Sequence, residues 1–100
     1  MPDPIANWER RIGRRLTLRD LHIFLAVVQW GSMAKAAAHL SISQPAISKS
    51  IADLERAVGA RLLDRSPRGI EPTAFGRALT RRGLAVFDEL RQGINEIEFL

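Results

Sequence analysis

Residues 31–51, GSMAKAAAHLSISQPAISKSI, decide the fold of this 100-residue chain. Ser32 is placed to cap a short alanine-rich helix that ends at Leu40. A three-residue turn follows, and Ser43 caps a second helix with Pro45 in its first turn, where no intrahelical N–H is needed. The stretch therefore predicts two helices joined by a tight turn.

Helical periodicity extends the pattern on both sides of this unit. Upstream, Thr17 with Asp20 three residues later is a variant of the capping box, and Gly31 ends the helix that they begin. Downstream, Gly59 ends the second helix of the unit. Apolar residues recur at helical spacing in both flanking stretches and predict one core shared by three helices. These residues are Leu21, Phe24, Leu25, Val28, Ile47, Ile51, Leu54 and Val58.

The pattern changes after the third helix. Residues 62–65 and 70–73 are short extended segments on either side of Pro67-Arg68-Gly69, which favours a hairpin. Thr73 then caps a last helix that runs from Ala74 towards the C-terminus. The predicted fold class is therefore mainly α: a winged helix-turn-helix with a three-helix core and a small two-stranded wing, followed by a long helix.

The last helix carries an apolar seam. Positions 79, 83, 86, 90, 93, 97 and 100 alternate by four and three, which is the heptad spacing of helices that pair with one another. One alternative is that the helix lies on its own domain; the other, which we favour, is that it projects and pairs with a second copy. Gly83 and Gly93 each lower helix propensity by about 1 kcal/mol or mark close backbone approach. The residues predicted to carry dimerisation are Leu79, Val86, Leu90, Ile94 and Ile97.

Charge is distributed unevenly along the chain. The net charge is +4, but residues 1–82 hold 14 of the 15 Lys and Arg residues against 7 of the 11 Asp and Glu residues. A basic body of this kind favours a polyanionic partner, nucleic acid before membrane. The chain has no cysteine, which excludes disulfides, thiolate chemistry and cysteine zinc sites. Its length allows a single domain.

The third helix has a polar outward face made of Gln44, Pro45, Ser48, Lys49 and Ala52. Gln can hydrogen-bond adenine at N6 and N7, and small apolar groups can contact a thymine methyl. A recognition helix contacts bases mainly through its N-terminal residues, and its dipole favours nearby phosphate. For Gln44, Ser48 and Lys49, an ordinary solvated helix face is the alternative.

Several segments together match the pattern of one protein family. They are residues 18–28, 31–37 and 43–51, Leu54 with Glu55, residues 62–65, Arg68 with Gly69, Pro72 with Thr73, and Gly76. By these matches the chain resembles the LysR-type transcriptional regulator family over nearly all of residues 17–100. The family often has Phe where Leu63 stands and Leu where Pro72 stands, and we take both as tolerated variants.

The resemblance implies a DNA-binding domain at residues 17–73 and a linker helix at residues 74–100 that makes a homodimer. Such a dimer recognises an interrupted, AT-rich palindrome in double-stranded DNA. Residues 1–16 form a basic extension outside the pattern, where Asp3 and Pro4 would begin a short helix; its arginines are either solvated surface or a further phosphate-binding arm. The DNA-binding residues carried over are Ser32 and Lys35 for the backbone, Gln44, Pro45, Ser48 and Lys49 for the major groove, and Arg65 and Arg68 for phosphate or minor groove. Ser43, which caps the recognition helix, is also predicted to bind DNA.

The sequence predicts that the chain is not an enzyme. Neither His22 nor His39 has a nucleophile or carboxylate placed by a motif, and no phosphate loop or metal spacing occurs, so we expect no cofactor and no metal. Residues 21–34, free of Asp, Glu, Lys and Arg, are too few to span a membrane, and the N-terminus lacks a secretory signal. We therefore expect a cytoplasmic protein with no membrane partner.

Two further expectations concern partners. Members of the family continue into an effector-binding domain, whereas this chain stops at Leu100, either as a fragment or as a naturally short member. We therefore expect a small-molecule effector to act only through a domain absent from this chain. The alternative function is a winged helix used purely for protein–protein contact, without specific DNA binding.

Overall fold

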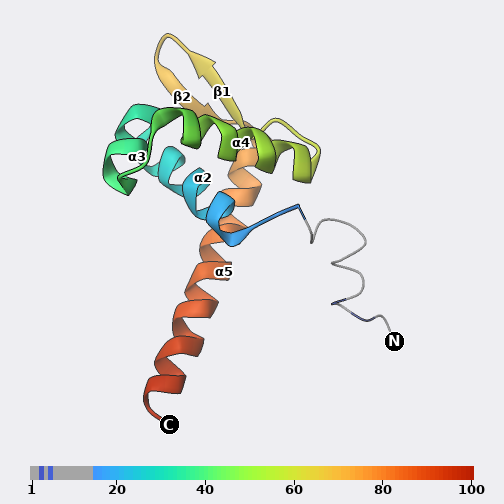
Figure 1. Ribbon diagram of the computed structural model, residues 1–100. Helices are drawn as coiled ribbons and strands as arrows, with labels where there is room; N and C mark the ends of the chain where they lie inside the picture. The colour runs from blue at the N-terminus through green and yellow to red at the C-terminus, as the bar shows by residue number, and fades with distance from the viewer. Residues whose placement is uncertain (1–2, 4, 6–14) are drawn as a thin grey trace.

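The computed structural model describes Asp3, Ile5 and residues 15–100. The N-terminal helix predicted from Asp3 and Pro4, like most of the basic extension, lies outside the described residues. In the described part, the predicted mainly α fold, a winged helix-turn-helix followed by a long helix, is confirmed. Its elements are α2 (Leu18–Trp30), α3 (Met33–Leu40), α4 (Gln44–Val58), β1 (Leu63–Ser66), β2 (Gly69–Pro72) and α5 (Ala74–Glu98) (Figure 1).

Each of these helices begins at a hydroxyl side chain that accepts a hydrogen bond from the backbone N–H three residues later. The donor–acceptor distance is 3.0 Å at Thr17, 3.2 Å at Ser32, 3.2 Å at Ser43 and 3.1 Å at Thr73. Such a bond satisfies one of the N–H groups that a helix leaves without an intrahelical partner. The predicted start of every helix after residue 16 is thus confirmed.

The tight turn between α3 and α4 depends on a left-handed backbone at Ser41, where φ is 57°. The N–H of Ser41 donates to the carbonyl of Ala38 at 3.3 Å, and that of Ile42 donates to the carbonyl of Ala37 at 3.1 Å. These bonds satisfy the last carbonyls of α3 while the chain reverses direction. The reversal brings α4 back across α2 and α3.

The three helices close on one hydrophobic core. Phe24 and Val27 of α2 and Ile47 and Leu54 of α4 are fully buried. α3 contributes small side chains there, which allow its backbone to approach the other helices closely. The predicted core positions are confirmed: Leu21, Phe24, Ile47, Ile51 and Leu54 are buried, and Leu25, Val28 and Val58 pack partly buried against them.

The hairpin is anchored at its base by hydrogen bonds from outside its strands. Glu55 Oε2 on α4 accepts a bond of 2.7 Å from the N–H of Leu62. Thr73 Oγ1 donates to the carbonyl of Arg61 at 2.6 Å, and the Thr73 N–H donates to the carbonyl of Leu62 at 2.9 Å. One threonine therefore both caps α5 and closes the hairpin.

The strands differ by one residue from their predicted limits. They pair antiparallel from Leu63 opposite Pro72 to Ser66 opposite Gly69, whereas segments 62–65 and 70–73 were expected. The shift follows from the anchoring bonds, because Leu62 and Thr73 are engaged at the hairpin base. The paired strands therefore run further towards the tip.

α5 packs on the core along its first half only. A Cβ built on Gly76 would lie 2.1 Å from the carbonyl oxygen of Leu62, so only glycine fits where α5 meets the hairpin base. Gly83 is buried, and a Cβ built there would lie 3.1 Å from Leu21 Cδ1 on α2. Beyond Phe87, which packs partly buried on the core, the helix leaves the domain and projects away from the hairpin (Figure 1).

Candidate nucleic-acid interface

The N-terminal turns of α4 carry exposed polar side chains. Gln44, Pro45 and Lys49 are exposed, as is the cap residue Ser43. Ser48 is half-buried, and its hydroxyl donates to Met33 Sδ on α3 at 3.5 Å. Of the five DNA-binding residues predicted on this stretch, four are thus exposed, and Ser48 is partly turned towards α3.

Ser32, Gln44 and Arg65 line one hollow of about 250 Å³, although they come from three separate parts of the chain. The Ser32 hydroxyl is engaged in capping α3, where it accepts the Lys35 N–H, while the Lys35 side chain is exposed. The Arg65 guanidinium donates to Met33 Sδ at 3.3 Å. A guanidinium beside the N-terminus of a helix is a favourable setting for an anion.

Met33 connects two predicted site residues and was not among them. Its side chain is 8% exposed, and its sulfur accepts from both Ser48 on α4 and Arg65 on β1. The sequence marks Met33 only as an apolar residue at the start of α3. Its position between α4 and β1 depends on tertiary packing, so no signal in the sequence could have identified it.

The hairpin tip presents Arg68 to solvent. Its N–H donates to Ser66 Oγ at 3.2 Å, which fixes the backbone of the tip. Within residues 15–100, its guanidinium makes no hydrogen bond or ion pair. At the other end of the turn, a Cβ built on Gly69 would lie 3.3 Å from the carbonyl oxygen of Gly31, so the hairpin approaches the turn before α3 closely. The hairpin therefore lies against the turn before α3, and the Arg68 guanidinium at its tip is unpaired among residues 15–100.

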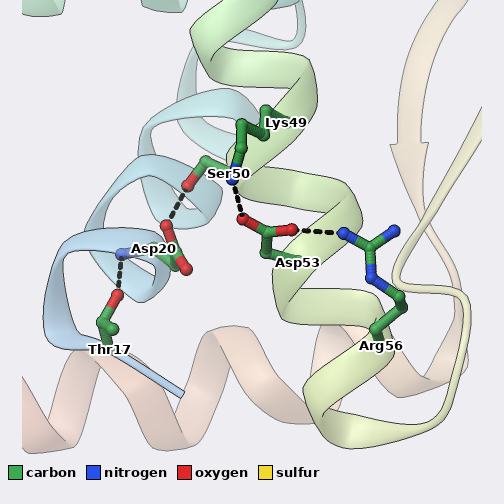
Figure 2. A network of polar contacts seen from close by, with 6 residues as sticks. All are labelled: Thr17, Asp20, Lys49, Ser50, Asp53 and Arg56. Atoms are coloured by element: carbon green, nitrogen blue, oxygen red, sulfur yellow. Dashed lines mark hydrogen bonds and ion pairs between the residues drawn. The ribbon is translucent and has the colours of Figure 1, made fainter. Parts of the chain in front are cut away.

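An acidic residue lies one turn after Lys49 on α4. Asp53 Oδ2 is 2.7 Å from Lys49 Nζ, and Asp53 Oδ1 accepts a hydrogen bond from Arg56 (Figure 2). The hydrogen bond from Lys49, with smaller contributions from Arg56, holds the pKa of Asp53 below its ordinary value of 3.8. Lys49 is thus exposed but already paired. The i, i+4 spacing of opposite charges was available in the sequence as a signal.

A second carboxylate, Asp20, connects α2 to α4. It accepts a hydrogen bond from the hydroxyl of Ser50 on α4, the residue that follows Lys49 (Figure 2). Ser50 is 6% exposed, so its buried hydroxyl on α4 finds a hydrogen-bond partner in the Asp20 carboxylate on α2. In the capping-box variant expected at Thr17, the Asp20 side chain would turn back to the helix start; it bonds Ser50 instead. This bond fixes the orientation of α4.

The apolar seam of α5 is divided between the chain's own core and solvent. Leu79 is partly buried against the core, beside the buried Gly83. For this first half, the alternative that the helix lies on its own domain is correct. The second half is open to solvent: Val86 is 42% exposed, Leu90 45%, Ile94 58% and Ile97 69%. Of the residues predicted for dimerisation, the last four form an uncovered apolar stripe.

The described residues do not meet the requirements of a metal site or of a membrane-spanning helix. Among residues 15–100 with Asp3 and Ile5, no group of His, Asp or Glu is arranged to hold a metal ion. The ring centroids of His22 and Phe87 lie 5.9 Å apart in an edge-on arrangement, and those of His39 and Trp30 lie 5.0 Å apart. None of the helices in this part of the chain has the length and hydrophobicity that crossing a bilayer requires.

The sequence matches a known family and its curated members. The model of the family "Bacterial regulatory helix-turn-helix protein, lysR family" matches residues 18–77. The HTH-type transcriptional regulator GbpR of Azospirillum brasilense is 37% identical over 95 residues, which are 95% of this chain and 27% of GbpR. The SDS degradation transcriptional activation protein of a Pseudomonas strain is 40% identical over 86 residues, covering 83% of this chain and 28% of that protein. The chain thus spans about a quarter of the length of these relatives.

Solved structures share the fold at similar identity. The BenM_DBD/catB site 1 DNA complex matches with a TM-score of 0.80 and 32% identity, over 83% of this chain and 93% of that one. The CbnR_DBD-DNA complex matches with a TM-score of 0.78 and 36% identity, over 83% of this chain and 95% of that one. The family model covers more than half of the chain, and the relatives agree with it. The chain therefore belongs to the lysR family of bacterial helix-turn-helix proteins, a family of DNA-binding transcription regulators and not of enzymes.

Proposed function

We propose that this chain binds double-stranded DNA sequence-specifically, as the DNA-binding part of a LysR-type transcription regulator in the bacterial cytoplasm. One observation carries the proposal: Gln44, on the exposed N-terminal face of α4, lines the same hollow as Arg65 of the hairpin and Ser32 at the start of α3. In this proposal residues 17–73 are the DNA-binding domain and residues 74–100 are the dimerisation helix.

The groove-facing role belongs to the first two turns of α4. Gln44 and Pro45 would meet base edges and thymine methyl groups in the major groove, since the N-terminal end of a recognition helix reaches deepest there. Ser43 and Ser48 would contact the groove wall through their hydroxyls. Lys49 would bind a phosphate once it has been released from its ion pair with Asp53.

The backbone-facing role belongs to the start of α3 and to the hairpin. Ser32 and Lys35 lie at the N-terminus of α3, where the helix dipole favours a phosphate. Arg65 borders the hollow next to Ser32, and Arg68 extends from the hairpin tip towards phosphate or the minor groove. Contacts of this kind orient the domain on the duplex and give the affinity that does not depend on sequence.

Dimerisation through α5 is the second part of the proposal. The stripe of Val86, Leu90, Ile94 and Ile97 is apolar and uncovered, and it continues the core-packed seam at Leu79. Two copies paired along it would present two α4 faces to one duplex. A two-fold protein recognises a two-fold site, so the operator is an interrupted palindrome.

Selection from a random duplex library tests the function. We expect the purified chain to enrich a palindromic duplex and to bind it at least a thousandfold tighter than a random duplex. Affinity for either duplex should fall steeply from 50 to 200 mM salt, because phosphate contacts release counterions. If no sequence is enriched and affinity is insensitive to salt, the proposal is wrong and the protein–protein module is the better account.

A further inference from the structure

We propose that Asp53 withholds Lys49 from DNA phosphate and so limits the affinity of this chain for DNA of unrelated sequence. The inference rests on the DNA binding proposed above and adds a residue to it. The proposal stands on the arrangement of three charged side chains along one side of α4, at positions 49, 53 and 56 (Figure 2).

The Asp53 carboxylate is paired with two cations at once, Lys49 and Arg56. Lys49 Nζ lies 2.7 Å from Asp53 Oδ2, within the range of a charge-assisted hydrogen bond. Arg56 bonds the other oxygen of the same carboxylate. The Asp53 side chain is 30% exposed, whereas that of Lys49 is 77% exposed, so the acceptor lies closer to the helix than its donor does.

The pair directs Lys49 away from the groove-facing end of the helix. Asp53 follows Lys49 by four residues, so the ammonium is drawn towards the C-terminal turns of α4, away from Gln44 and Pro45. A phosphate can bind Lys49 only by replacing the Asp53 carboxylate. That carboxylate would also repel the phosphate if it stayed nearby.

Arg56 makes this exchange reversible. When Lys49 leaves, Asp53 keeps its bond to Arg56 and is not left without a counter-charge. Lys49 is therefore held back rather than permanently neutralised. In loosely bound complexes on unrelated DNA, where no base contacts hold α4 in the groove, Lys49 stays with Asp53 and adds no phosphate contact.

The chain offers a matched control for the charge change. Asp88 on α5 accepts a hydrogen bond of 2.7 Å from Arg91 and another of 2.7 Å from Gln92, so it is also an exposed, paired aspartate. Asp88→Asn changes the net charge as Asp53→Asn does, at a site in the projecting half of α5. A general charge effect would act through both substitutions, whereas release of Lys49 would act through Asp53 alone.

The experiment measures the affinity of each variant for a labelled random-sequence 30-base-pair duplex at several salt concentrations. Asp53→Asn is expected to bind about eightfold tighter at 0.1 M salt and to steepen the dependence of log affinity on log salt by about 0.9, the share of one phosphate contact. Asp88→Asn is expected to change affinity less than twofold. Asp53→Glu keeps a carboxylate and should behave as the wild type.

Double substitution identifies the cation involved. In a Lys49→Ala background, the gain from Asp53→Asn should fall to the level of the Asp88→Asn control. A gain that persists without Lys49, or one that Asp88→Asn reproduces, would overturn the role of Asp53 while DNA binding stands. A wild type that binds no duplex at any salt concentration would instead contradict the proposed function itself. Circular dichroism of each variant establishes that the fold is retained.

Discussion

Neighbouring side chains of α4 differ in whether their polar atoms are engaged within the fold. Gln44 is exposed at the first turn, Ser48 shares the sulfur of Met33 with Arg65, and Lys49 is paired with Asp53. An exposed amide has only to lose water and side-chain freedom to reach a base, whereas a paired ammonium must also exchange its partner. Residue types alone would have treated Gln44 and Lys49 as equally available.

Gln44→Ala is expected to relax discrimination at one base pair in each half of the selected duplex. The loss should be about 1–3 kcal/mol if the amide contacts a base edge directly, and the melting temperature should stay unchanged because the residue is exposed. Fluorescence anisotropy with single base-pair variants measures it. Gln92→Ala, at another exposed glutamine on α5, is the control and should leave discrimination intact. Equal losses on selected and random duplexes would show that Gln44 does not contact a base.

Lys49→Ala is expected to raise the pKa of Asp53 towards its ordinary value of 3.8, since the hydrogen bond from Lys49 is the largest cause of the lowering. A carboxyl whose pKa is lowered by folding stabilises the fold above its unfolded pKa, and this contribution is lost as the pH falls through the folded value. The pair is therefore intact at neutral pH and is lost only in acid below pH 3.8, as the pH falls through the lowered pKa of Asp53. Carboxyl-carbon NMR titration measures the change. Asp88, whose pKa is lowered mainly by the hydrogen bond from Arg91, should not respond.

The proposed DNA-facing surface consists of two parts, the well-packed helix α4 and the projecting hairpin. α4 is fixed by its buried stripe and by the Asp20–Ser50 bond. The hairpin is anchored at its base by Glu55 and Thr73 and along β1 by the bond from Arg65 to Met33, and its tip is open to solvent. We therefore expect changes in α4 to affect sequence preference and changes at the hairpin tip to affect affinity for every duplex.

Arg68→Ala is expected to weaken binding to selected and random duplexes by similar factors. The salt dependence of log affinity should become shallower by about 0.9, as one phosphate contact is lost. Titrations at four salt concentrations measure the slope. Arg91→Ala removes the same charge from the projecting half of α5 and should leave the slope unchanged. A slope that Arg68→Ala does not alter would mean that the arginine stays in solvent.

Gly76→Ala is expected to lower the free energy of unfolding by about 1–3 kcal/mol, because the added methyl group collides with the backbone of Leu62. Gly93→Ala is the control, since nothing lies within 4 Å of a Cβ built there, and the substitution should stabilise α5 by up to about 1 kcal/mol. Urea denaturation followed by circular dichroism measures both. Equal stability of the two variants would mean that the α5–hairpin contact is looser than described.

Local signals explain why the helices could be predicted and the hairpin limits could not. Ser32, Ser43 and Thr73 cap their helices through bonds to residues three positions away, which a linear sequence reveals. The hairpin base is defined by Glu55, seven residues before its partner Leu62 and on another element. Its register therefore depends on how α4 packs, and periodicity carries no information about that.

The same distinction applies to the candidate site. Exposure of Gln44 and Lys49 follows from their place opposite the buried stripe of α4, so the face could be predicted. The roles of Met33 and Ser50 depend on neighbours 15 and 30 residues away and could not be predicted. The α5 seam was predicted as one surface. Periodicity identifies an apolar face but not what covers it, and here the first half is covered by α2.

In the whole molecule, the proposed DNA-facing surface and the uncovered apolar stripe lie at opposite ends. The hairpin and α4 form one end, and the projecting half of α5 forms the other (Figure 1). A partner bound along α5 would therefore leave both α4 faces free. A single recognition helix spans only a few base pairs, so two copies at fixed spacing are needed for selectivity against a genome of competing sites.

The most direct test of this account is the mass of the chain in solution for Leu90→Glu and for its control Leu84→Glu. Leu90 lies in the middle of the uncovered stripe, and Glu there would bury a carboxylate in the dimer at a cost of several kcal/mol. Leu84 is 57% exposed and lies outside the stripe, since six residues at 3.6 per turn place it about 120° around the helix from Leu90.

Light scattering with circular dichroism measures mass and fold together. We expect the wild type and Leu84→Glu to be dimers at tens of micromolar, and Leu90→Glu to be a folded monomer with much weaker binding to the selected duplex. A monomeric wild type, or a Leu90→Glu variant that remains dimeric with unaltered DNA affinity, would contradict this expectation.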